Sequence, residues 1–189
     1  MKLAKFAILA TAFLVIWMMF RSCTSNSSSS YSSSKNVVDT ATIPKEVNNK
    51  TWQYFDQEDK MTSKKTYYAL VEANELLEFD FPYNGGSTVT LTIRNKNGEN
   101  NAYLSVTKGQ MLTRSYETTS YRVRFDNQPL QYYPFVAPSD NSSDLAFINN
   151  TTKFIKNLKK SKKVIVELEF YQEGLRAIEF DVSNLKWNH

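Results

Sequence analysis

The sequence predicts a mainly β protein, an antiparallel β-sandwich of about eight strands with one helix near residues 151–160 and an N-terminal hydrophobic helix. Three observations support this fold class. Apolar and polar residues alternate with a period of two in several short segments, which is typical of strands with one buried and one wet face. Turn-forming pairs such as Asn97-Gly98 lie between these segments. Aromatic residues make up 14% of the 189 residues, which supplies enough large apolar side chains for a core.

The alternation places the expected strands along the chain. In one clear case Val89, Leu91 and Ile93 point to one face, and the threonines between them point to the other. The expected strands are residues 51–56, 65–73, 76–81, 88–94, 101–107, 121–126, 164–171 and 175–182. Successive short strands of this kind pair antiparallel, so we expect a sandwich or a partly closed barrel.

The single expected helix has an apolar face and a basic face. Its apolar residues recur at helical spacing, namely Phe154, Ile155 and Leu158. Thr151 or Thr152 is suited to cap its N-terminus, because a threonine hydroxyl accepts hydrogen bonds from free backbone N–H groups. We expect this helix to pack across an open end of the sheets.

Residues 1–22 are predicted to be a signal peptide or membrane anchor. A short basic start is followed by Phe6 to Phe20, in which only Thr11 is polar. This length suits the apolar region of a signal peptide better than a complete membrane span. Three of the 23 basic residues lie in this segment, so the rest of the chain has 20 basic and 19 acidic residues. That balance gives no reason to expect nucleic-acid binding.

The segment Phe20-Arg21-Ser22-Cys23 resembles the lipobox of bacterial lipoproteins. Ser22 and Cys23 match the pattern, whereas Arg21 departs from it, because that position is usually small or hydroxylated. The resemblance implies that Cys23 is lipidated and becomes the new N-terminus. The alternatives are an uncleaved transmembrane helix and free secretion. We expect an exported, membrane-anchored protein of the bacterial cell envelope, with its domain in the periplasm or at the cell surface.

Two further segments complete the expected organisation. Residues 23–49 are Ser-rich at their start and are predicted to form a flexible tether, because they have little apolar surface to bury. Residues 50–189 are expected to form the β-sandwich domain.

The composition argues against an enzyme. One cysteine, Cys23, cannot form an internal disulfide, and the chain has one histidine, His189. Zinc sites and nucleophilic triads need more of these residues, so we expect no catalytic residues, no metal and no cofactor.

Two charged clusters and one aromatic run are candidates for partner binding. They comprise Lys153, Lys156, Lys159, Lys160, Arg122, Arg124, Tyr132 and Tyr133. The cations suit an anionic envelope component or an acidic protein face. Each candidate also has a structural explanation. The lysines can form a solvated helix face, and the arginines can pair across strands with Glu78, Asp80, Glu167 or Glu169. Tyr132 and Tyr133 can fold into the core.

Several motifs resemble a family of uncharacterised bacterial envelope proteins and, more distantly, the VasI-type accessory proteins of type VI secretion. They are Trp52, Asp59-Lys60-Met61-Thr62, Gly85-Gly86, the Phe154-Ile155 helix and Trp187, within residues 51–187. The resemblance carries no activity and no catalytic residues. The same motifs have expected structural roles. Gly85 and Gly86 are expected to allow a tight turn between strands. Asp59 and Thr62 are expected to hold a loop by hydrogen bonds to nearby backbone amides. Trp52 and Trp187 are expected to pack together and close the fold.

These features predict a non-enzymatic module, tethered to the envelope, that binds another envelope or secretion-system protein. The alternatives are a cell-wall hydrolase that uses acidic residues, and a phage- or plasmid-encoded envelope protein that excludes competitors.

Overall fold

The computed structural model describes residues 51–113 and 119–189. The predicted signal peptide or anchor, the lipidation residue Cys23 and the predicted tether lie outside the described residues. Within the described ranges, no helix is long and apolar enough to cross a membrane.

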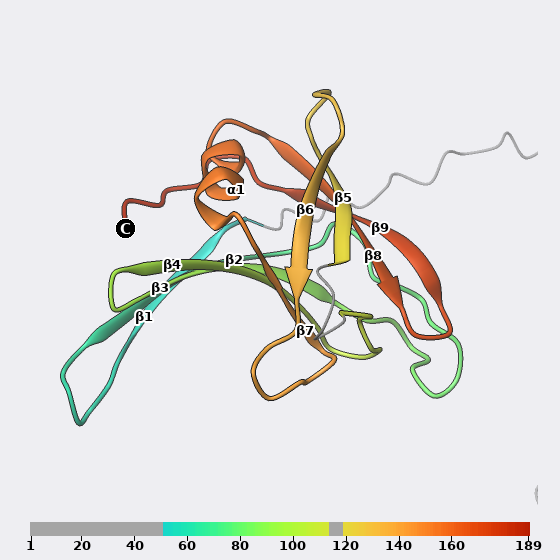
Figure 1. Ribbon diagram of the computed structural model, residues 1–189, viewed down its shortest axis with the longest axis horizontal. Helices are drawn as coiled ribbons and strands as arrows, with labels where there is room; N and C mark the ends of the chain where they lie inside the picture. Colours follow the sequence, from blue (N-terminus) through green and yellow to red (C-terminus); the bar gives the residue numbers. More distant parts are fainter. Residues whose placement is uncertain (1–50, 114–118) are drawn as a thin grey trace, which may run out of the picture. The chain divides into compact units, whose positions relative to one another are not determined.

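Nine strands and one helix make up the described part of the chain (Figure 1). The strands are β1 (Gln53–Glu58), β2 (Lys65–Glu72), β3 (Val89–Lys96), β4 (Glu99–Val106), β5 (Thr119–Phe125), β6 (Gln131–Val136), β7 (Leu145–Ile148), β8 (Lys163–Phe170) and β9 (Gly174–Asp181). The helix is α1 (Thr151–Leu158).

All nine strands belong to one antiparallel sheet in the order β1-β2-β3-β4-β7-β6-β5-β8-β9. The mainly β, antiparallel prediction is confirmed, whereas two separate sheets are not observed. The sheet curls instead: just beyond β2, the N–H of Asn74 donates to the carbonyl of Glu179 in β9, at 2.8 Å. Figure 1 shows β5 and β6 crossing over β3 and β4. The core lies between the two halves of this curled sheet.

The core is rich in aromatic rings supplied by both the sheet and α1. Phe154 of α1 makes edge contacts with Phe125 and Tyr133, with ring centroids 5.6 and 5.3 Å apart. All three side chains are fully buried. The apolar face predicted for the helix is therefore correct, since Phe154, Ile155 and Leu158 are its buried residues.

The predicted cap of α1 is wrong. Asn150 precedes the helix in a left-handed conformation, with φ 58°, and makes no side-chain cap hydrogen bond. The hydroxyl of Thr151 instead donates to the carbonyl of Ile148, at 3.0 Å. This bond faces back toward β7, so it ties the helix to the preceding strand.

The predicted strand at residues 76–81 is also wrong. This segment contributes one isolated bridge, between Leu77 and Ser87. The N–H of Asp80 donates to the Glu173 carboxylate at 2.8 Å, and the Asp80 carbonyl accepts the N–H of Tyr83 at 2.9 Å. The backbone N–H and C=O of Asp80 are thus satisfied by a side chain and a turn rather than by a neighbouring strand.

The strands β6 and β7 are not among the expected strands, and β6 contains a proline, Pro134. Pro134 lies inside β6, opposite Ser120 of β5. Its carbonyl accepts the N–H of Asn149, at 2.8 Å, on the side of β7. The N–H that proline lacks would point to this same side, just where β7 has ended at Ile148. The sheet therefore tolerates the proline here.

Candidate functional site

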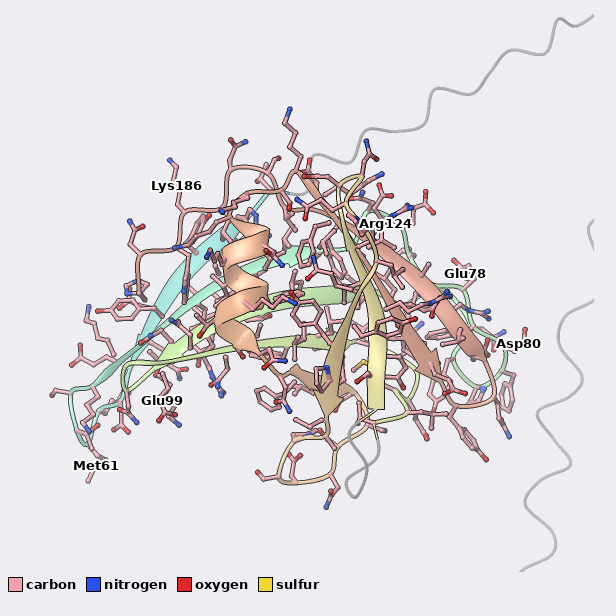
Figure 2. All side chains as sticks on the ribbon, turned by 45° about the horizontal axis from the view of Figure 1, so that its top comes forward. Met61, Glu78, Asp80, Glu99, Arg124 and Lys186 are labelled. Atoms are coloured by element: carbon pink, nitrogen blue, oxygen red, sulfur yellow. The ribbon has the colours of Figure 1, made fainter. Side chains whose placement is uncertain are left out.

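The candidate arginines do not form a joint anion site. Arg122 pairs with Glu167 on the neighbouring strand β8, with 2.6 Å between Nε and Oε1. The hydrogen bond and charge of Glu167 raise the pKa of Arg122. Cross-strand pairing with Glu167 is one of the alternatives to partner binding that the sequence indicates for Arg122. Arg124, labelled in Figure 2, is exposed and takes part in no ion pair among the described residues.

The aromatic run divides between core and solvent. Tyr133 is fully buried, and Tyr132 is 63% exposed. The Tyr133 hydroxyl accepts a hydrogen bond from Asn157 of α1, at 3.0 Å. Burial raises the pKa of Tyr133, and the Asn157 bond opposes this shift. Tyr133 is therefore a core residue that holds the helix, and only Tyr132 is available to a partner.

Among the motif residues, Asp59, Gly85 and Gly86 have the local roles that were predicted for them. Asp59 Oδ1 accepts the backbone N–H groups of Met61 and Thr62, at 2.7 and 3.1 Å. These bonds close the β1–β2 hairpin loop, and Figure 2 shows Met61 at its free end. Gly85 and Gly86 both have positive φ, 86° and 74°, as the tight turn before β3 requires.

The two tryptophans lie in the same core without a direct ring contact among those the structure describes. The Trp187 indole N–H donates to Asn100 Oδ1 at 3.1 Å, and its ring meets that of His189. The buried Nε1 of Trp52 has no hydrogen-bond partner in the described residues. The expected closure is made instead by the Tyr54 hydroxyl, which accepts the N–H of Lys186 at 2.8 Å.

An aromatic surface covers the solvent-facing side of β1, β2, β3, β4 and β7. It consists of Phe55, Tyr68, Arg94, Tyr103 and Phe147. Strand register makes these residues neighbours: Phe55 is opposite Tyr68, which is opposite Arg94, and Tyr103 is opposite Phe147. Phe55 is 49% exposed, and the other four are half-buried. We call this set the aromatic surface.

Rings and a cation pack tightly within the aromatic surface. Phe55 and Tyr68 stack with centroids 4.6 Å apart. The Arg94 guanidinium lies 5.7 Å from the Tyr103 ring centre and 5.6 Å from that of Phe147. Cation–π attraction of this kind is strongest where water is excluded. The arginine is thus a fixed positive charge between apolar rings.

Burial within the aromatic surface changes the pKa of one of its tyrosines, Tyr103. Burial raises the pKa of Tyr103, and this effect outweighs the hydrogen bond with Thr92 and the charge of Arg94, which both lower it. Thr92, between the rings on the same face, is only 5% exposed. The rings therefore shield one another from water although they face solvent.

A second surface, the lysine groove, lies between α1 and the end of the described chain and holds about 320 Å³. The helix side contributes Thr152, Ile155, Lys156, Lys159 and Lys160. The other side contributes Asn100, Trp187 and His189. The three lysines are exposed, and their side chains form no ion pair or hydrogen bond within the described part of the chain. Lys153 lies outside the groove, with its ammonium 5.3 Å from the Tyr133 ring centre.

Asn100 of β4 makes the floor of the lysine groove rigid. Its amide N–H donates to the His189 carbonyl at 3.0 Å, and its Oδ1 accepts the Trp187 indole N–H at 3.1 Å. The His189 ring also stacks on Tyr67, with centroids 3.9 Å apart. One asparagine and one tyrosine therefore hold the C-terminal segment against the sheet.

The described residues contain no group of three or more His, Cys, Asp or Glu side chains that is arranged to hold a metal ion. Searches with the chain matched no protein-family model, no curated protein and no solved structure. The aromatic surface and the lysine groove are therefore the two candidate functional sites of the described residues.

Sequence reasoning found the lysines of the groove but missed the aromatic surface. A signal was present, because Tyr68 and Tyr103 are aromatic residues on the polar phase of their strands. Their positions in the alternation do not show which rings contact one another. Tyr103 lies opposite Phe147 only because β4 pairs with β7, a strand that was not expected.

Proposed function

We propose that this chain is a non-catalytic binding module, held at the bacterial cell envelope by its N-terminal segment, whose domain docks an extended segment of another envelope or secretion-system protein. The observation that carries the proposal is the aromatic surface beside the open sheet edge formed by β1.

The edge strand β1 is suited to accept another strand. It pairs with β2 alone, and all six of its residues are exposed. Among residues 51–113 and 119–189, the backbone N–H and C=O groups on its outer side therefore have no strand partner, which is the arrangement used in β-augmentation. The opposite edge differs, because β9 already bonds to Asn74 through the Glu179 carbonyl.

The aromatic surface supplies specificity next to this edge. An added strand would place every second side chain on the same face as Phe55 and Tyr68. Stacked rings at a solvent-facing position favour an apolar or aromatic side chain there. Arg94, two strands in from the edge, suits a carbonyl or carboxylate of the same partner. The predicted partner is thus an extended segment with alternating apolar residues.

In-cell photo-crosslinking tests the docking part of the proposal. A photoreactive residue at Gln53, on the outer face of β1, should capture one envelope protein. Phe55→Lys should reduce this crosslink by about tenfold or more, because it puts a charge where a ring must pack. The matched control is Tyr171→Lys, which changes a 50% exposed ring after β8 and should leave the crosslink intact. Equal yields in the two variants would contradict docking at β1.

Membrane fractionation tests the tethering part. If Cys23 is lipidated, Cys23→Ser should move the protein from the membrane fraction to the soluble fraction. A variant still in the membrane would favour the uncleaved N-terminal helix. Recovery of the wild-type protein in the cytosol with its first residues intact would refute the envelope location altogether.

A further inference from the structure

We propose that the lysine groove is a membrane-contact site that binds the phosphate groups of anionic phospholipids, and that it lays the domain against the membrane that anchors it. This inference rests on the proposed tethering and adds a second, electrostatic contact between the domain and the bilayer.

The charge of the groove is the first argument. Lys156 lies in the last turn of α1, and Lys159 and Lys160 follow directly after the helix, so the three ammonium groups can reach the same plane. Within the described residues none of them is neutralised by a carboxylate, and none of the other residues that line the groove is acidic. Lysine is a strongly hydrated point charge, which suits the varied geometry of lipid phosphates better than a single bidentate site.

The floor of the groove is the second argument. Trp187 is 3% exposed and Ile155 is 6% exposed, so the lysines project from an apolar base. Asn100 fixes this base through its bonds to Trp187 and His189. Cations around an apolar floor match a lipid headgroup, whose phosphate adjoins a glycerol and acyl chain.

The start of the described domain also lies close to the groove. Thr51, the first described residue, lines a hollow together with Lys186, whose neighbour Trp187 lines the groove. Figure 2 shows Lys186 and Met61 at opposite ends of the β1 region. Among the described residues that line this hollow, the one acidic side chain is Asp181, and it already accepts hydrogen bonds from Ser183. Thr51, which the connection of residues 24–50 separates from Cys23 in the sequence, thus lies close to residues that line the groove.

The length of that connection keeps the groove within reach of the bilayer. Residues 24–50 separate Cys23 from Thr51. For a Ser-rich chain of this length the expected end-to-end distance is about 30 Å, which holds the domain at a high effective concentration near the surface. Weak attraction by a few lysines is then sufficient to orient the domain.

The test uses the full chain in lipid nanodiscs and measures how fast each lysine is acetylated by a soluble reagent, read by mass spectrometry. With phosphatidylglycerol, Lys156, Lys159 and Lys160 should react roughly tenfold more slowly than with phosphatidylcholine. Lys60 and Lys64, on the β1–β2 hairpin loop, should react equally in both. Raising the salt concentration should remove the protection, because screening weakens attraction between exposed charges. Equal rates in both lipids would overturn the proposal.

Two matched variants and one added anion sharpen the test. Lys159→Gln with Lys160→Gln should return Lys156 to its rate in phosphatidylcholine, whereas Lys60→Gln with Lys64→Gln should not. If inorganic phosphate protects the groove in phosphatidylcholine discs as well as phosphatidylglycerol does, the ligand is a soluble anion and the membrane assignment is wrong.

Flotation of the same discs separates this inference from the proposed function. A chain that floats with phosphatidylcholine discs but shows no lysine protection has its tether and lacks the membrane-contact site. A chain that does not float with either lipid refutes the tethering, and this inference with it.

Discussion

The aromatic surface and the lysine groove are both open to solvent, but different parts of the fold build them. The aromatic surface draws one residue from each of five strands, and its neighbours are set by cross-strand register. The groove takes Lys156 from α1 and two lysines from the residues directly after it, and sets them against a buried tryptophan. The comparison teaches that charged sites can be visible as local sequence clusters, whereas a sheet surface exists only after strands have paired.

The two surfaces also depend on the core to different degrees. The floor of the groove is itself core, because Trp187 is buried and bonded to Asn100. The rings of the aromatic surface lie on the other side of the sheet from the core, and Phe55 is half exposed. Damage to the groove should therefore destabilise the domain, and damage to the aromatic surface should act mainly on binding.

The largest effect is expected for Trp187→Ala. Removing a buried indole leaves a cavity and removes one hydrogen bond to Asn100, and such changes cost about 3–5 kcal/mol of unfolding free energy. Urea denaturation followed by circular dichroism measures this value. Lys159→Ala, which removes a charge from the same groove without removing core, should leave the unfolding midpoint unchanged. A Trp187→Ala domain as stable as wild type would show that the floor is not part of the core.

A smaller effect is expected for Tyr103→Ala. The side chain is half-buried between Phe147 and Arg94, so its loss removes cross-strand contacts worth about 1 kcal/mol. The same denaturation experiment should give Phe55→Ala a smaller cost than Tyr103→Ala, since Phe55 is more exposed. A reversed order would mean that the edge strand, rather than the centre of the aromatic surface, is the better packed.

Alkaline titration offers a third, weaker readout of the comparison. Because burial raises the folded-state pKa of Tyr103 above its ordinary value of 10.0, the associated stability is complete below that pH and is lost as the pH rises through the folded-state pKa. Ultraviolet absorbance should therefore show a late-ionising tyrosine that disappears in Tyr103→Phe. Tyr133 shares the direction of this shift, so one late tyrosine should remain in that variant. An absorbance titration of Tyr103→Phe that keeps every late-ionising tyrosine of the wild type would contradict the burial of Tyr103 in the aromatic surface.

The smallest effect is expected at the β1–β2 hairpin loop, far from the groove floor. Backbone hydrogen bonds from Met61 and Thr62 lower the pKa of Asp59 below its ordinary value of 3.8. The stabilisation is thus present above that pH and is lost as the pH falls through the lower folded-state pKa. Nuclear magnetic resonance shifts of the Met61 and Thr62 amide protons should report this acid transition. Asp59→Asn keeps an acceptor oxygen but cannot ionise, so its amide shifts should stay flat in the same range.

Much of the fold was predictable because it depends on local alternation. Seven of the eight expected strands correspond to β1, β2, β3, β4, β5, β8 and β9, and the helix is present with its predicted buried face. The failures have local causes. Residues 76–81 alternate like a strand, but Asp80 bonds to the Glu173 side chain instead. The strand β6 contains Pro134, which the sheet tolerates because β7 ends where the missing N–H would be needed.

The candidate residues divide in the same way. The hairpin role of Asp59 and the turn at Gly85 and Gly86 were predictable, because these depend on contacts between near neighbours in sequence. The ion pair of Arg122 was foreseen only as one of several options, since Glu167 is 45 residues away. No pattern in the sequence predicted that Asn100 would hold the C-terminal segment.

By itself the sequence determined the mainly β class, the helix with its lysines, and the local turns, because hydrophobic period and turn chemistry act over a few residues. Tertiary structure alone decided that one curled sheet replaces two, that Tyr133 faces inward, and that rings from four strands meet Arg94 of a fifth on the outer face. The physical reason is that strand order and register link residues far apart in the chain, and the energies that choose among pairings are shared over the whole core.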